Sequence, residues 1–315
     1  MPKLNHSERL DDAARAAWLY YVAQNTQDEI AEKMGVSRQS AQRLVALATR
    51  ERLVKFRLDH PIAKCMDLAQ RLKDRYGLDF CEVTLADPSS DDPALGIAQV
   101  AATEMERVLS TESPIVMALG TGREIRGAVE QISAMNCPQH KVVSLVGSLA
   151  PDGSANVNDP ITVIGDATRA PRHPLALPVL ATSKEERDII SAQKPIRKNI
   201  ALAQAADVAF VGIGELNDAP PMLTDGFITK EELRDLIAAG GAGEIVGWAY
   251  DDHGKLISGQ TNDRVASVPL RQPPDKPIVG VARGPNKVRA IRGALAGRWI
   301  TGIITDETTA ETLLG

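Results

Sequence analysis

Apolar segments of strand length alternate with amphipathic segments of helix length along most of the chain beyond residue 61. The helical patterns lie at residues 62–78, 96–110, 123–133, 230–240 and 286–297. The apolar segments are residues 80–87, 114–120, 141–148, 207–214, 243–251, 277–284 and 300–306. Apolar strands separated by helices are typical of a mainly parallel sheet that is covered by helices on both faces. The pattern therefore predicts an α/β domain, and the apolar content of 43% is sufficient for its core.

Residues 26–50 have the pattern of two short helices separated by a glycine. Thr26 can cap the first helix, and Glu29, three residues later, completes a capping box. Gly35 follows, where a sharp turn between helices needs a positive φ. Ser37 then caps a second helix that has an apolar stripe. The buried positions predicted for the two helices are Ile30, Ala31, Met34, Ala41, Leu44, Val45 and Ala48.

An amphipathic pattern before this hairpin, at residues 9–25, supplies a third helix. Its predicted buried side chains are Ala14, Ala17, Trp18 and Tyr21. After the hairpin, residues 53–58 alternate like a short strand, as in a winged variant or a connector. Near this segment we place the boundary between a helix-turn-helix domain, residues 1–58, and a second domain, residues 59–315. A chain of 315 residues is comfortable for two domains.

The charge of the chain is divided unevenly between these two parts. The net charge is −5, yet residues 1–60 contain ten Lys and Arg against eight Asp and Glu. An acidic body repels nucleic acid, so a DNA-binding face must be local, and the basic segment at the second helix qualifies. Arg and Gln near the N-terminus of a helix can read base edges in the major groove. A helical hairpin with a solvated polar face is the alternative. The predicted DNA contacts are Thr26, Gln27, Ser37, Arg38, Gln39, Ser40, Gln42, Arg43, Lys55 and Arg57.

Four of the predicted strands end in turns that contain glycine, at residues 118–124, 145–153, 211–218 and 281–287. Ligands bind outside the carboxyl ends of the strands in an open α/β sheet, where glycines let backbone N–H groups approach an anion or a polyhydroxy ligand. The first turn, Gly120-Thr121-Gly122, runs directly into a helix and matches neither a P-loop nor a dinucleotide-binding motif. Chain reversal alone would explain any one of these turns, but four at successive strand ends predict a ligand pocket.

Other polar residues lie in segments near these turns. Glu244 stands at the start of one apolar segment, and Lys287 opens the helix after another. A polar loop and a basic segment follow the second turn, with Asp152, Asn156, Asn158, Asp166, Arg169, Arg172 and His173. For each of these residues alone, a solvated loop position is the simpler explanation. The His residue has no carboxylate or Cys at ligand spacing, and the three cysteines, Cys65, Cys81 and Cys137, are expected to be structural thiols. We therefore expect neither a metal nor a cofactor.

Segments from both ends of the chain together resemble the SorC-type family of sugar-responsive transcriptional regulators. These segments are residues 19–54, 207–218, 241–255, 277–295 and 300–314. The resemblance implies an N-terminal helix-turn-helix joined to a doubly wound, Rossmann-like effector domain that resembles ribose-5-phosphate isomerase and glucosamine-6-phosphate deaminase. It also implies operator DNA as a partner, a sugar, polyol or sugar phosphate as effector, and a homodimer or homotetramer. The effector-facing positions that it implies are Gly120, Thr121, Gly122, Arg123, Gly147, Ser148, Gly212, Gly214, Glu244 and Lys287, to which we add Asn158 and Asp166 from the polar loop.

The chain departs from many relatives at two of these turns. It lacks a bulky residue or Trp before the first Gly-x-Thr, and Gly147-Ser148 stands where relatives have two glycines. The phosphorylation state of the effector is therefore open. Arg123 and Lys287 favour an anion, whereas the Asn and Asp residues of the 152–166 loop suit free hydroxyls, and we favour a free sugar alcohol or sugar.

A sugar-phosphate isomerase or deaminase is the alternative from another class, because its glycine-threonine-glycine turn is similar. Such an enzyme needs a general base, for which Glu244 or Asp166 would be available. No catalytic motif rich in acids accompanies the turn, and an isomerase has no use for residues 1–58, so we interpret the protein as a regulator and not an enzyme. The absence of an apolar run of 18 residues and of a signal pattern favours a cytoplasmic location without a membrane partner.

Overall fold

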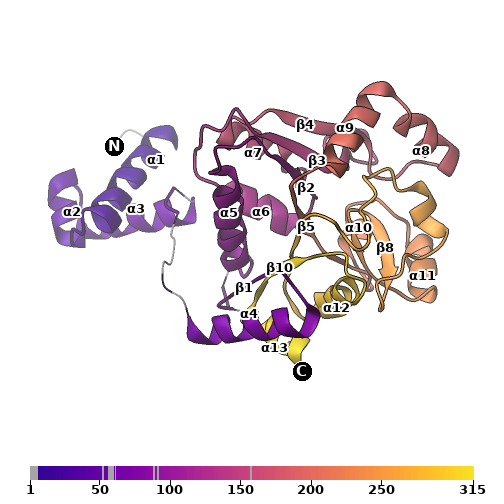
Figure 1. Ribbon diagram of the computed structural model, residues 1–315. Coiled ribbons are helices and arrows are strands. Elements are labelled where there is room, and N and C mark those ends of the chain that lie inside the picture. The colour runs from indigo at the N-terminus through magenta and orange to yellow at the C-terminus, as the bar shows by residue number, and fades with distance from the viewer. Residues whose placement is uncertain are drawn as a thin grey trace. The chain divides into compact units, whose positions relative to one another are not determined.

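The computed structural model describes residues 6–315 except 52, 56–59, 61, 88, 91 and 157. The chain divides into two compact units, Met1–His60 and Pro61–Gly315 (Figure 1). The boundary predicted after residue 58 and residues 56–58 of the predicted strand lie outside the described residues, whereas residues 53–55 do not form a strand. Each unit is described separately below.

The first unit is helical. Its elements are α1 (His6–Ala17), the π-helix η1 (Trp18–Val22), α2 (Gln27–Met34) and α3 (Arg38–Arg50). Both sides of the capping box at Thr26 and Glu29 are present, and Gly35 ends α2 with a φ of 66°. The Ser37 hydroxyl accepts a hydrogen bond from the Ser40 amide at 3.2 Å and so caps α3. These local signals explain why α2 and α3 begin and end where they do.

Small side chains pack the helices of this unit together. Ile30, Ala41, Val45 and Ala48 are buried as predicted, and Ala31, Met34 and Leu44 are half-buried. For the preceding segment, Ala17 is buried as predicted, but Ala14, Trp18 and Tyr21 are exposed, and the buried stripe of α1 is Ala13, Ala16 and Ala17. The reason is that α1 packs closely on α3 through alanines, in a cluster with Leu47 and Ala48. Trp18 lies one position after Ala17 and so points away from this closely packed alanine face, whereas the Tyr21 hydroxyl reaches Thr49 of α3 at 3.3 Å.

The second unit contains a seven-stranded parallel sheet in the order β1-β10-β9-β5-β2-β3-β4. Its strands are β1 (Phe80–Thr84), β2 (Val116–Leu119), β3 (Lys141–Leu149), β4 (Arg172–Pro178), β5 (Val208–Gly212), β9 (Ile278–Val281) and β10 (Gly302–Asp306). The α/β class and the parallel sheet are as predicted. The sequence does not predict strand β4, because Arg172 and His173 at its start are typical of a solvated loop.

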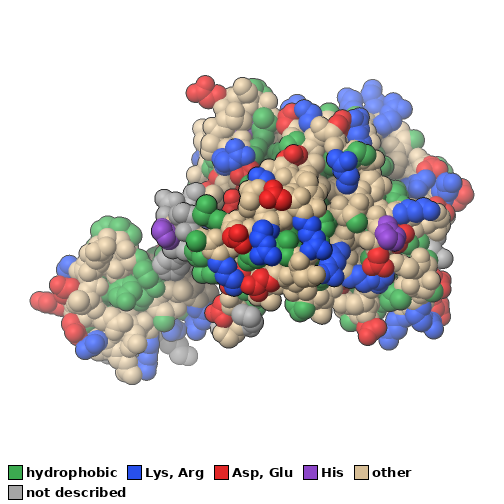
Figure 2. All heavy atoms as spheres, turned by 60° about the horizontal axis from the view of Figure 1, so that its bottom comes forward, with side chains coloured by type: hydrophobic (Ala, Val, Ile, Leu, Met, Phe, Trp, Pro, Cys, Tyr) green, Lys and Arg blue, Asp and Glu red, His purple; other side chains and the backbone are tan. Residues whose placement is uncertain are grey.

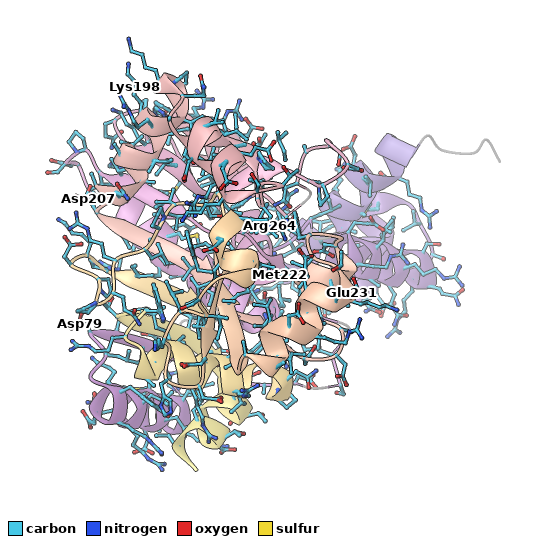
Figure 3. All side chains as sticks on the ribbon, turned by 90° about the vertical axis from the view of Figure 1, so that its right-hand side faces the viewer. Asp79, Lys198, Asp207, Met222, Glu231 and Arg264 are labelled. Carbon is cyan, nitrogen blue, oxygen red and sulfur yellow. The ribbon has the colours of Figure 1, made fainter. Side chains whose placement is uncertain are left out.

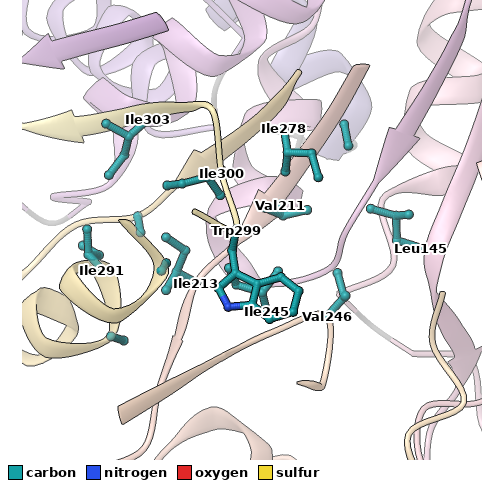
Figure 4. Close-up of a cluster of buried hydrophobic side chains, with 14 of the residues drawn as sticks. Leu145, Val211, Ile213, Ile245, Val246, Ile278, Ile291, Trp299, Ile300 and Ile303 are labelled. Atoms are coloured by element: carbon teal, nitrogen blue, oxygen red, sulfur yellow. The ribbon is translucent and has the colours of Figure 1, made fainter. Parts of the chain in front are cut away.

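Helices cover both faces of this sheet. One face is packed by α5 (Leu95–Leu109), α6 (Arg123–Gln131) and α7 (Ile161–Thr168). The other face is packed by α4 (Ala63–Tyr76), α9 (Lys194–Gln204), α12 (Val288–Ala296) and α13 (Glu307–Leu314). Figure 4 shows part of this second core, in which Trp299 lies among aliphatic side chains such as Ile213, Ile245 and Val246. The aliphatic core agrees with the low aromatic content of 3%.

Residues 243–251 form a hairpin instead of a strand of the main sheet, which corrects the sequence prediction. They belong to a separate three-stranded antiparallel sheet of β6 (Gly214–Glu215), β7 (Gly241–Ile245) and β8 (Trp248–Asp251). The chain reverses at Val246 and Gly247, with φ of 48° and 89°. Val246 is buried, so the turn is apolar and its sequence resembles a continuous strand. A β-branched residue with positive φ is strained, and it persists because packing holds it there.

The remaining short helices are α8 (Lys184–Ser191), α10 (Pro221–Thr224), α11 (Lys230–Ala238), η2 (Gln260–Arg264) and η3 (Pro285–Lys287). On the face of the second unit that Figure 2 turns forward, basic and acidic side chains are interspersed. Among the ion pairs of this unit, Lys64 contacts both Glu307 and Glu311 at 2.8 Å. In the described part of the chain, no helix is long and apolar enough to cross a membrane.

Candidate functional site

The exposed face of α3 carries most of the predicted DNA contacts. Ser37, Arg38, Gln39, Gln42 and Arg43 are all exposed, and Ser40 is half-buried beside the Ser37 cap. These residues occupy the first two turns of the helix, opposite the stripe that packs into the unit. The N-terminal half of α3 therefore presents forked and amide donors to solvent, an arrangement that can reach base edges in a groove.

The other predicted DNA contacts have different surroundings. The Thr26 hydroxyl is engaged with Glu29 in the capping box, Gln27 is half-buried, and Lys55 is exposed. Arg57 lies outside the described residues. Arg38 approaches Asp28 of α2 at 3.4 Å, but both side chains are more than two-thirds exposed, at 68% and 69%. Such an exposed pair is weak, so Arg38 is free to exchange Asp28 for another anion.

A cavity of about 140 Å³ opens at the carboxyl ends of strands β2 and β5. The predicted effector residues that line it are Thr121, Gly122, Arg123, Asn158, Gly212, Gly214, Glu244 and Lys287. They come from the turn after β2, the polar loop, the ends of β5 and β6, strand β7 and η3. All four of the predicted glycine-bearing segments therefore contribute to a single cavity, the second of them only through Val146, as expected for the carboxyl edge of a parallel sheet.

Four predicted effector residues do not line this cavity. A Cβ at Gly147 would lie 2.4 Å from the Leu177 carbonyl, so this glycine permits the close pairing of β3 with β4. The Ser148 hydroxyl donates to the Leu175 carbonyl at 3.2 Å across the same pair of strands. Gly147 and Ser148 lie within strand β3 and serve strand packing, so the prediction that they face the cavity is wrong.

Gly120 and Asp166 are the other two corrections. A Cβ at Gly120 would lie 3.2 Å from the Val211 Cα atom, so this glycine lets β2 approach β5. Asp166 lies in helix α7 and not in a loop, and it pairs with Arg172 at 2.7 Å. Its side chain is 67% exposed, and it is therefore a surface residue rather than a cavity residue.

The turn after β2 is held by hydrogen bonds to the polar loop. The Thr121 hydroxyl donates to the Asn158 carbonyl at 2.9 Å. The Asn158 amide donates to the side chain of Asn156, which is buried and also lines the cavity. A Cβ at Gly212 would lie 2.9 Å from the Thr121 carbonyl, so only glycine fits beside this turn. The polar loop therefore supports the position of the Gly-Thr-Gly turn.

Charged side chains form the polar wall of the cavity. Lys287 and Glu124 are mostly buried, and the Lys287 Nζ atom donates to Glu124 Oε1 at 2.5 Å. Arg123 approaches Asp225 at 3.8 Å. These ion pairs join η3 to α6 and join α6 to the segment that follows α10.

Glu244 is a half-buried acid in this wall. Burial raises the pKa of its carboxyl group, and the Gly247 amide and Lys287 partly oppose that rise. The Gly247 amide donates to Glu244 Oε2 at 2.7 Å, so the carboxylate fixes the strained turn between β7 and β8. A carboxyl group with a raised pKa in a cavity is typical of a ligand-binding site.

Sequence reasoning missed several residues that line the cavity, namely Glu124, Glu215, Met222, Asp225 and Phe227, and it placed Asn156 only in the polar loop near the predicted pocket. Glu124 and Glu215 lie within two of the predicted glycine-bearing segments, 118–124 and 211–218, so their neighbours in sequence were a usable signal. Met222, Asp225 and Phe227 belong to or follow α10, a short helix without periodicity that could be read. Among the described residues, no group of three or more His, Cys, Asp or Glu could hold a metal ion.

Comparison with known proteins identifies the family. The family described as "Putative sugar-binding domain" matches residues 60–315. The chain belongs to the SorC-type family of sugar-binding transcriptional regulators. It is 32% identical over 303 residues to the erythritol catabolism regulatory protein EryD of Brucella abortus, with 96% of each chain covered. It is 30% identical over 315 residues to the transcriptional regulator LsrR of an Enterobacter species, with 96% of this chain and 92% of that protein covered.

The family resemblance extends to the structure of the whole chain. The crystal structure of the full-length sorbitol operon regulator SorC from Klebsiella pneumoniae matches with a TM-score of 0.71 and 26% identity. The match covers 98% of this chain and 100% of that chain. As a member of this family the protein is a transcriptional regulator with a sugar-binding domain, and the relatives named here are regulators and not enzymes.

Proposed function

We propose that this protein binds operator DNA through α3 and that a sugar, sugar alcohol or sugar phosphate in the cavity controls this binding. In this role it regulates a sugar or polyol catabolic operon. The observation that carries the proposal is the presence in one chain of a helix with an exposed, basic N-terminal half and of a cavity lined by hydrogen-bonding groups. The named roles of EryD in erythritol catabolism and of SorC in the sorbitol operon support it.

The helical unit acts as a helix-turn-helix in this proposal. The N-terminal half of α3 enters the major groove, where Arg38, Gln39 and Arg43 contact bases or phosphates. Lys55 and Arg57 add contacts to the DNA backbone. The capped start of α3 supports this role, because a helix N-terminus also favours a nearby phosphate.

The cavity acts as the effector site in a doubly wound domain of the kind found in ribose-5-phosphate isomerase and glucosamine-6-phosphate deaminase. Its wall combines donors, such as Lys287 and the amides at the start of α6, with acceptors, such as Glu244. A hydroxyl group is both a donor and an acceptor, so such a mixed wall suits a carbohydrate. The effector changes DNA affinity through its different affinity for two arrangements of the protein, with a coupling of about 1–3 kcal/mol.

A homodimer or homotetramer is the form that we propose for DNA binding. Helix-turn-helix proteins commonly bind two half-sites about one helical turn of DNA apart, which requires two recognition helices. Operator DNA as the partner also places the protein in the cytoplasm. Size-exclusion chromatography with light scattering, with and without operator DNA, tests the oligomeric state, and a monomer under both conditions would contradict it.

The proposal is tested by a thermal-shift screen of the full chain against sugars, sugar alcohols and their phosphates, combined with a gel-shift assay. The gel-shift assay uses DNA from upstream of the protein's own gene. We expect specific binding to this DNA, and we expect a carbohydrate that stabilises the protein to change that binding. Turnover of ribose 5-phosphate by a chain without DNA affinity would reverse the conclusion.

A further inference from the structure

The cavity wall carries more acidic than basic side chains. Among the described residues that line it, the acids are Glu124, Glu215, Asp225 and Glu244, and the bases are Arg123 and Lys287. Each base already has a carboxylate partner: Lys287 contacts Glu124 at 2.5 Å, and Arg123 lies 3.8 Å from Asp225. Glu215 and Glu244 are left without an ion-pair partner in the part of the chain that the structure describes. The local field in the cavity therefore opposes a second anion.

Glu215 is the acid whose hydrogen-bonding capacity is least satisfied. It ends the short strand β6, which pairs with β7, so its carboxylate is carried on the same small sheet as Glu244. The Oε2 atom of Glu215 is buried and has no hydrogen-bond partner among the described residues. Glu244, in contrast, accepts the Gly247 amide. A buried carboxylate oxygen without a donor is costly, and a donor supplied by a ligand removes that cost.

The chemistry of the missing partner follows from what a carboxylate can accept. An ionised carboxylate only accepts hydrogen bonds, so its partner must carry an O–H or N–H group. A phosphate dianion also only accepts hydrogen bonds, and it would face Glu215 and Glu244, while the mostly buried base, Lys287, is already paired with Glu124. The hydroxyl groups of a polyol donate to carboxylates and at the same time accept from backbone amides, such as those at the start of α6 next to Gly122.

We propose that this cavity selects an uncharged polyhydroxy ligand, a sugar alcohol or free sugar, over its phosphate ester, and that Glu215 accepts a ligand hydroxyl and determines this choice. The inference rests on the proposed effector function and narrows the class of effector. Glu215 excludes the phosphate by repulsion and binds the polyol through a charge-assisted hydrogen bond. Glu124 already balances the charge of Lys287, so Lys287 is not available to bind a phosphate. In this arrangement the ion pair between them positions the cavity wall.

The test is isothermal titration of the full chain with erythritol, ribitol and sorbitol, each compared with its own phosphate monoester. At least one of the polyols should bind, and its phosphate ester should bind roughly tenfold or more weakly. The Glu215→Gln variant keeps the shape of the side chain but loses its charge. It should bind that polyol roughly tenfold more weakly and should discriminate less against the phosphate ester.

Glu231→Gln is the matched control, because it makes the same chemical change on the surface of α11. The Glu231 side chain is 83% exposed, and Figure 3 shows it on α11, whereas Met222 of α10 lines the cavity. This variant should bind both ligand classes as the wild type does. Thermal unfolding and operator binding check that Glu215→Gln is folded. If it is not, the comparison of polyol with phosphate ester on the wild type decides the question.

Three outcomes contradict the inference in distinguishable ways. Binding of a phosphate ester as tight as that of its polyol overturns the inference but leaves the proposed effector function intact. Unchanged polyol affinity in a folded Glu215→Gln variant overturns the role of Glu215. Failure of every polyol and every phosphate ester to bind the wild type overturns the effector function and the inference together.

Discussion

The Ile30→Ala substitution tests whether the helical unit is stabilised by its own core. Ile30 is fully buried and is the largest buried side chain that α2 contributes to this unit. Truncating a buried isoleucine to alanine costs about 2–5 kcal/mol through lost burial and the cavity that remains. A unit of this size has a total stability of about 3–9 kcal/mol, from roughly 0.05–0.15 kcal/mol per residue. The substitution therefore removes a large fraction of the stability of Met1–His60.

The expected result is selective unfolding of the helical unit. Calorimetry of the full chain should show its transition lowered by roughly 10 °C or more, because 1 kcal/mol corresponds to about 4–8 °C in a small domain. The thermal transition of Pro61–Gly315 and its stabilisation by effector should persist. Operator binding at about room temperature should weaken or disappear. Val22→Ala is the control, because Val22 is 64% exposed and its truncation should change stability by less than about 0.5 kcal/mol.

The reasoning would be refuted by equal loss of both transitions. If Ile30→Ala lowers the transition of the sugar-binding unit as much as that of the helical unit, the two do not unfold separately. The same conclusion would follow if the variant lost its effector-induced stabilisation. A normal transition and normal operator affinity would show that Ile30 does not support the core as its burial indicates.

Three further predictions concern the DNA face, the second sheet and the half-buried acid. Replacing both Arg38 and Arg43 with Ala should abolish operator binding in anisotropy titrations while effector-induced thermal stabilisation persists; retained operator affinity would remove α3 from the DNA interface. Gly243→Ala should destabilise the sugar-binding unit by about 1–3 kcal/mol in urea unfolding, because a Cβ there would lie 2.4 Å from the Ala290 Cβ atom, and a neutral result would mean that α12 moves freely. Burial raises the folded-state pKa of Glu244 above 4.5. The stability that the protonated form of Glu244 contributes is therefore fully present below the pKa of the unfolded state, and it is lost as the pH rises through the pKa of the folded state. Glu244→Gln should therefore gain in free energy of unfolding relative to the wild type as the pH rises above the ordinary pKa of a glutamate, and a difference that does not change with pH would contradict the assigned burial.

The class of the fold and most of the sheet could be predicted because their signals are local. Apolar strands such as 207–214 and the capped start of α2 at Thr26 are determined by residues that are close in sequence. The hairpin at Val246 could not be predicted, because a buried turn has an apolar sequence. The aromatic residues of η1 were assigned to the wrong face because hydrophobicity favoured Trp18, while close packing of helices favoured alanines.

The cavity could be predicted in part for the same reason. Turns that follow strands β2 and β5 converge because parallel strands end at one edge, so Thr121 and Gly212 lie together. In the sequence, Gly147 cannot be distinguished from the glycines that line the cavity. The tertiary structure shows that it allows β3 to pack closely on β4. The segment around Met222 covers the cavity through long-range packing, and no short-range pattern marks it.

The most direct measurement of the central claim is the affinity of the full chain for fluorescently labelled upstream DNA, with and without the carbohydrate that stabilises it. The account predicts specific binding whose dissociation constant changes by about 5- to 150-fold when that carbohydrate is saturating. The Arg38→Ala, Arg43→Ala double variant should give no binding in either case. Superimposable titration curves with and without a carbohydrate that is bound would contradict the claim that the cavity controls the DNA-binding helix.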